Sequence, residues 1–185
     1  MCKKWLVAVV FCLILPFANA QNDTEYEEIE WIVLMPDDDL AALMNPPSYI
    51  DDVMEGSPAD SLDLLHGGIE EDPRTAPYLK ALGSTTVIEE YNGRNIRIPG
   101  FIVPLSSDDD QNITEFFIVP YFGACLHLPP PPPNQMLHVK TDKGVQLKSL
   151  EDAFWFEGTV KVETTNSMLG TAAYGLELAN WMPYE

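Results

Sequence analysis

Residues 85–105 have the sequence TTVIEEYNGRNIRIPGFIVPL, and this stretch decides the fold. Two runs typical of strands, 85–88 and 96–105, flank the dipeptide Asn92-Gly93. Both residues of the dipeptide tolerate positive φ angles, so it is a strong signal for a tight turn between two strands. We therefore expect a β-hairpin here, and with it a change from an irregular N-terminal part to a β domain.

Four further runs of the strand type follow the expected hairpin, at residues 115–120, 135–141, 154–164 and 174–178. Turn signals separate them, which is typical of an all-β domain. About six short strands in roughly 100 residues predict a mainly β fold, a small antiparallel barrel of five or six strands or a curved sandwich.

Residues 21–84 form an acidic extension with short predicted helices. One helix is expected after Pro36, because proline and the acidic residues 37–39 suit the first turn of a helix. A second is expected over residues 73–82. The mature chain is thus predicted to consist of this extension and a β-barrel domain at residues 85–185.

The first 20 residues have the pattern of a cleavable secretory signal peptide. Lys3 and Lys4 precede an apolar run of 13 residues, 5–17, which ends in Ala18-Asn19-Ala20. The run is shorter than the roughly 20 residues that span a membrane. We expect cleavage after Ala20 and an exported protein with no transmembrane segment in the mature chain.

The chain is strongly acidic, with 29 Asp and Glu against 10 Lys and Arg and a net charge of −19. Cleavage would remove Lys3 and Lys4, leaving 8 basic residues against 29 acidic ones and a charge of −21. Such a surface disfavours nucleic acid and anionic membranes as partners. Cleavage would also remove two of the three cysteines. Cys125 would then have no partner for an internal disulfide.

Cys125 lies in the most distinctive block of the sequence. Gly123-Ala124-Cys125-Leu126-His127-Leu128 is followed by five prolines, 129–133, and by Asn134-Gln135. In an extended chain Cys125 and His127 point to the same side, because they are two residues apart. The next predicted strand carries His138, which could return close to this pair. One thiolate and two imidazoles with an open position suit zinc or copper.

Three interpretations of this block remain open. In the first, Cys125, His127 and His138 bind a metal, with His66 as a further candidate ligand. In the second, Cys125 is a nucleophile or redox centre assisted by His127, and Asn134 orients the imidazole. In the third, Cys125 is a buried apolar residue, and the barrel face or the proline run binds a protein partner.

An acidic segment, residues 106–112, imitates the start of a calcium-binding loop through Asp108, Asp110 and Asn112. The imitation fails because Ile113 stands where the loop needs glycine, and Val119 stands where it needs a closing glutamate. We interpret this segment as a solvated hairpin loop.

Three blocks together resemble an uncharacterised family of exported Gram-negative proteins known as domain of unknown function three-two-nine-nine. They are GFIVPL at 100–105, EFFIVP at 115–120 and the Gly-x-Cys-x-His, proline-rich, Asn-Gln block at 123–135. The resemblance covers residues 31–184 and implies an OB-like β-barrel in the periplasm. Matched one by one, the motif residues are Gly123, Cys125, His127, Pro130, Asn134 and Gln135, whereas His138 lies outside the motif.

The resemblance implies no activity, although some relatives resemble lipoproteins or accompany envelope transporters. We therefore hypothesise a periplasmic accessory or binding protein, more a metal carrier than an enzyme. Zinc is the first candidate and copper the second, and an envelope transporter or another periplasmic protein is the expected partner.

Overall fold

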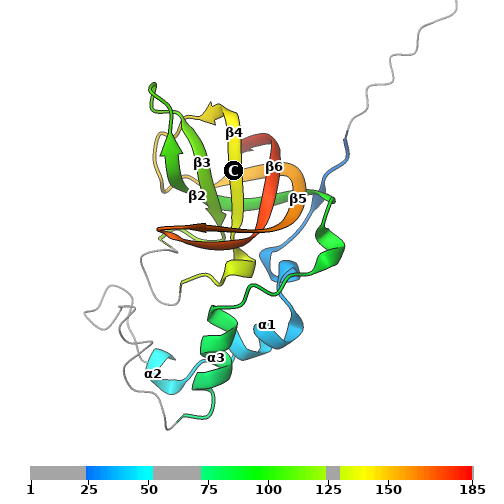
Figure 1. Cartoon of the computed structure of the whole chain (residues 1–185), viewed down its shortest axis with the longest axis vertical. Helices are drawn as coiled ribbons and strands as arrows, with labels where there is room; N and C mark the ends of the chain where they lie inside the picture. The colour runs from blue at the N-terminus through cyan, green and yellow to red at the C-terminus, as the bar shows by residue number, and fades with distance from the viewer. Residues whose placement is uncertain (1–23, 52–71, 124–129, 185) are drawn as a thin grey trace, which may run out of the picture.

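The computed structural model describes residues 24–51, 72–123 and 130–184 (Figure 1). The predicted signal peptide at residues 1–20 lies outside these ranges. In chain order the elements are β1 (Glu27–Glu28), η1 (Trp31–Leu34), α1 (Asp37–Leu43), α2 (Ser48–Asp51), α3 (Thr75–Leu82), η3 (Glu89–Tyr91), β2 (Asn95–Ser107), β3 (Ile113–Val119), η4 (Pro133–Gln135), β4 (Leu137–Val145), β5 (Phe154–Ser167) and β6 (Gly170–Pro183), where η denotes a 3-10 helix.

Strands β2 to β6 close into a barrel in the order β2-β3-β4-β6-β5, with β5 pairing back onto β2. All neighbours are antiparallel except β4 and β6, which pair in parallel at Leu137 with Tyr174 and His138 with Gly175. This arrangement confirms the mainly β, OB-like barrel that the sequence predicts. It differs in that the barrel is mixed instead of wholly antiparallel. Strand β1 adds a short parallel pairing to β2.

The expected hairpin around Asn92-Gly93 is wrong in its first strand. Residues 85–88 are not a strand, and η3 follows them. The N-terminal half of β2 already pairs with β5 and β1, so no edge is free for residues 85–88. The turn region bonds to β5 instead, where the Gly93 N–H donates to the Val160 carbonyl.

The barrel interior is the main hydrophobic core. Ile96, Ile98 and Ile102 alternate along β2, point inward and are 3% exposed or less. Each such side chain contributes about 1.5–3 kcal/mol when it leaves water. Phe116 of β3 packs inside against Phe156 of β5, with ring centroids 6.2 Å apart. The period-two pattern of β2 thus places one face in the core.

A smaller apolar cluster lies on the opposite face of β3. Phe117 and Val119 pack there with Met136 and with Ala172 of β6. Both faces of β3 are therefore covered, which explains why residues 115–120 read as a nearly continuous apolar run.

Helices α1 and α3 pack against each other beside the barrel, as Figure 1 shows. Both were expected from the sequence, α1 with Asp37, Asp38 and Asp39 in its first turn. Helix α3 begins two residues later than predicted. No helix in the described ranges has both the length and the apolar character needed to cross a bilayer.

The acidic segment 106–112 is a hairpin loop between β2 and β3. The Asp108 carboxylate accepts hydrogen bonds from the backbone N–H groups of Asp110 and Asn112 and from the Asn112 side-chain amide. These bonds hold the pKa of Asp108 below its ordinary value, the Asn112 side-chain bond being the largest cause. The Asp108 oxygens thus serve the turn itself, as expected for a loop of this kind.

Tyr174 on β6 connects the barrel to two distant segments. Its side chain is fully buried. The hydroxyl accepts a hydrogen bond from the Ile88 N–H at 2.6 Å and donates one to the Leu34 carbonyl at 2.9 Å. Burial raises the pKa of the phenol, so the group stays a neutral donor and acceptor. One oxygen atom thereby fixes η1 and the segment before β2 against the barrel.

We predict that Tyr174→Phe lowers the free energy of unfolding by about 1–3 kcal/mol, because it leaves a backbone donor and a backbone acceptor without their partner. Urea denaturation followed by circular dichroism measures this change. The control is Tyr184→Phe at an exposed position, which should change stability by less than about 0.5 kcal/mol. Equal stability of Tyr174→Phe and the wild type would contradict the bridging role.

Candidate functional site

Of the three predicted metal ligands, the structure places His138. Cys125 and His127 lie within residues 124–129, outside the described ranges, and His66 lies within residues 52–71, also outside them. The described part of the candidate site consists of His138 and of the motif residues Gly123, Pro130, Asn134 and Gln135.

The connection that contains the motif leaves and returns at the same end of one ladder. In the β3–β4 ladder, Ile118 pairs with Leu137 and Phe117 pairs with His138. Gly123 stands near the start of this connection with φ +75°, a left-handed conformation that favours glycine. His138 is thus close to the point where the strand re-enters the barrel after the motif.

Asn134 and Gln135 tie the end of the motif to the N-terminal region. Asn134 is fully buried, and its amide donates to the Asp39 carboxylate at 3.0 Å and to the Thr86 carbonyl at 3.1 Å. The Gln135 amide donates to the Trp31 carbonyl at 2.8 Å. The two side chains therefore hold η4 in place, so Asn134 and Gln135 have a structural role.

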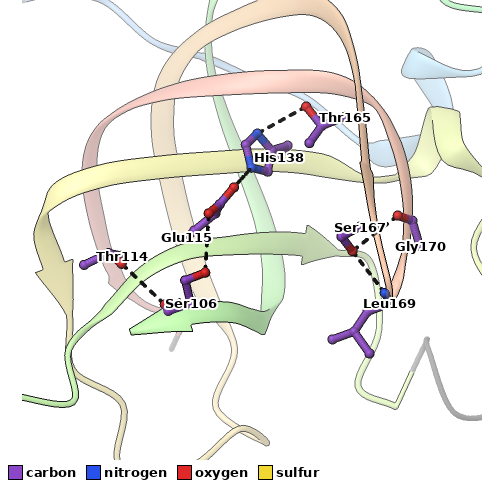
Figure 2. Close-up of polar contacts among 8 residues, drawn as sticks. All are labelled: Ser106, Thr114, Glu115, His138, Thr165, Ser167, Leu169 and Gly170. Atoms are coloured by element: carbon purple, nitrogen blue, oxygen red, sulfur yellow. Dashed lines mark hydrogen bonds and ion pairs between the residues drawn. The ribbon is translucent and has the colours of Figure 1, made fainter. Parts of the chain in front are cut away.

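His138 points away from the barrel interior, on the face of Phe117. Its Nε2 lies 2.9 Å from a Glu115 carboxylate oxygen, and its Nδ1 lies 3.4 Å from the Thr165 hydroxyl (Figure 2). The edge of the imidazole meets the Phe117 ring, with centroids 6.0 Å apart. The side chain is 12% exposed. Strands β3 and β5 thus orient a nearly buried imidazole that β4 supplies.

The Glu115 carboxylate determines which ring nitrogen of His138 donates a hydrogen bond and which one can accept. The hydrogen bond with His138 is the largest cause that holds the pKa of Glu115 below its ordinary value, and the charge of Lys140 also lowers it. An ionised carboxylate only accepts hydrogen bonds, so Nε2 donates to Glu115, and whenever the imidazole is neutral its lone pair lies on Nδ1. The arrangement can therefore present Nδ1 to a metal ion or to a proton donor such as Thr165.

Sequence reasoning missed Glu115 and Thr165. Glu115 pairs with Lys140 and is thus the diagonal neighbour of His138 across the ladder. The sequence does not reveal that Glu115 contacts His138, because this diagonal contact depends on the register of β3 and β4. The described ranges contain no group of three or more His, Cys, Asp and Glu side chains that could hold a metal ion. His138 and Glu115 are therefore a pair to which further ligands would have to be added.

The closed barrel of five strands makes this a small β protein of the OB-like type, and the Glu115–His138 pair lies on its outer face. The chain belongs to the family described as "Protein of unknown function (DUF3299)", whose model matches residues 31–183. It is similar to a DUF3299 family protein from Pseudomonas aeruginosa PAO1 with a crystal structure, at 34% identity and a TM-score of 0.60. That match covers 87% of this chain and 97% of the other. No curated protein matches.

We predict that Glu115→Gln lowers the free energy of unfolding at neutral pH by about 1 kcal/mol or less, since the pair is partly exposed. A lowered carboxyl pKa contributes stability above the unfolded-state pKa, and this stability is lost as the pH falls through the folded-state pKa. The difference from wild type should therefore be complete above about pH 4.3 and shrink below it.

Urea denaturation from neutral to acidic pH measures this difference. Glu177→Gln is the control, because Glu177 has an exposed ion pair with Lys161 at 3.2 Å. A Glu115→Gln difference that stays constant as the pH falls would contradict the assignment of Glu115 as an ionised partner of His138.

Proposed function

We propose that this protein is a periplasmic accessory protein that binds a transition metal, zinc first, through Cys125, His127 and His138. The observation that supports the proposal best is the hydrogen bond between His138 Nε2 and Glu115. Metal-binding histidines generally donate their second ring nitrogen to a carboxylate, which fixes the tautomer and makes the other nitrogen a better ligand. Glu115 is placed to do this for His138.

The chemistry of the other two residues supports the same proposal. A thiolate and an imidazole two residues apart are ligands that zinc and copper accept. A single cysteine in an oxidising compartment is protected from oxidation when a metal holds it. The acidic surface, with a net charge of −19 for the whole chain, attracts cations and raises their local concentration.

Export and transfer complete the proposal. Residues 1–20 supply the secretory signal pattern. A carrier with an open coordination position can pass its metal to another protein by ligand exchange. An envelope transporter or another periplasmic protein is the partner that we propose for this transfer.

The test is metal analysis of mature protein purified without a histidine tag. We expect uptake of about one zinc ion per chain and release of protons as the thiol ionises. Protein that is free of metal, and that stays free after exposure to zinc and to copper, would refute the proposal.

Variants then identify the ligands. Cys125→Ser, His127→Gln and His138→Gln should each abolish tight binding. Glu115→Gln should weaken zinc affinity by about 10- to 100-fold while leaving the ligands in place. Glu177→Gln, which removes one exposed acidic charge, is the control and should bind zinc like the wild type. Competition with a chromogenic chelator measures all five affinities.

A second function, thiol chemistry at Cys125 with His127 as base, is favoured by a different observation. The side-chain oxygen of Asn134 is buried and has no hydrogen-bond partner within the described ranges. A buried acceptor is normally paired, and an imidazole N–H is a suitable donor. In a Cys-His-Asn arrangement the asparagine oxygen accepts that hydrogen bond and orients the base.

Thiol labelling separates the two functions. If Cys125 is an activated nucleophile, metal-free protein should react with iodoacetamide well below the ordinary thiol pKa of about 8.5. His127→Gln should shift the reaction back to the ordinary pH range. A Cys125 that resists alkylation until the protein is denatured would exclude the enzymatic alternative.

A further inference from the structure

An aromatic cavity of about 410 Å³ opens where β1 and η1 meet β2 and β5. Three aromatic side chains line it, Trp31, Trp155 and Tyr184, together with two glutamates, Glu28 and Glu30. Its volume falls within the range of small-molecule sites, about 300–1,000 Å³. The cavity shares no residue with the His138 site, so a ligand could bind in it whether or not a metal binds at His138.

The Trp31 ring, and the backbone that carries Tyr184, are held in position before any ligand arrives. The Trp31 indole N–H donates to the Pro99 carbonyl at 2.6 Å. The backbone N–H of Tyr184 donates to the Ala153 carbonyl at 3.0 Å. The Tyr184 and Trp155 rings lie 5.1 Å apart with a tilt of 36°. Fixed rings lose little conformational entropy on binding, which favours even a small ligand.

One cation already occupies this neighbourhood. The Arg97 guanidinium lies over the Trp155 ring, 4.3 Å from its centroid. The same side chain is 3.9 Å from Glu28 and 4.0 Å from Glu157. The contact between Arg97 and Trp155 is thus a cation–π interaction within the protein. A ligand cation would make the same kind of contact with the neighbouring rings. Arg97 is not among the residues that line the cavity.

We propose that this cavity binds a small organic ammonium ion. The ring faces attract positive charge, and the Glu30 carboxylate supplies a counter-charge, whereas Glu28 already lies 3.9 Å from Arg97. The same carboxylate would repel an anion. The two glutamates offer an inorganic ion only a few oxygen ligands, fewer than the six to eight that calcium takes, and the aromatic walls add none. A weakly hydrated ammonium with alkyl groups fits both the apolar rings and the acidic rim. Quaternary ammonium groups are the ligands that aromatic cages recognise in general.

Choline is the probe, and its uncharged isostere 3,3-dimethyl-1-butanol is the control ligand. Calorimetry and tryptophan fluorescence at constant ionic strength measure binding to the mature protein. We expect saturable choline binding in the millimolar range or tighter, at least five-fold stronger than binding of the isostere. Equal binding of the two ligands, or no saturation up to roughly 50 mM choline, would overturn the proposal.

Two matched pairs of variants assign the binding to this cavity. Tyr184→Leu should weaken choline binding by at least three-fold, and Tyr184→Phe should retain it because the ring face remains. Glu30→Gln should weaken binding two- to five-fold, whereas Glu90→Gln, which removes the same charge on η3, should not. Thermal unfolding confirms that each variant is folded. Equal losses for both members of either pair would show that choline does not bind in this cavity.

Discussion

The position of the N-terminal segment on the barrel, and of every site built with it, depends on the hydrogen bonds of the Tyr174 hydroxyl. This single atom accepts from Ile88 and donates to Leu34, so three segments far apart in the sequence meet at it. The buried hydroxyl and the two backbone groups satisfy one another there. Residues 31–34 are consequently part of the packing of the barrel, and the path of the chain into β2 is fixed from the same point.

Trp31 extends this constraint to the sites. Its carbonyl accepts the hydrogen bond of Gln135, which holds the end of the Cys-x-His block. Its indole donates to Pro99 and lines the aromatic cavity. The proposed metal site and the proposed ammonium site thus have no residue in common, yet both rely on the position of η1. A short 3-10 helix outside the barrel therefore has more influence on function than its length suggests.

Features with local causes could be predicted from the sequence. The runs that became β3 and β5 were recognised, because alternation and strand propensity lie within each run. Residues 85–88 were misassigned because pairing needs a free edge on β2, and edges are set by distant strands. At the site, Asn134 and Gln135 were visible as a motif, but their partners lie 95 and 104 residues away. The Glu115–His138 contact depends on strand register, which no local pattern reveals.

The parallel pairing that closes the barrel is only two register pairs long, Leu137 with Tyr174 and His138 with Gly175. His138 and Tyr174, which fixes the N-terminal segment, are therefore diagonal neighbours across this short β4–β6 pairing, the seam of the barrel. A ligand that restrains His138 also restrains this seam, and the docking of η1 on Tyr174 does the same from the other strand. For the metal site proposed above, the consequence is reciprocal: a metal that bound more tightly when η1 is docked would hold η1 in place by the same factor.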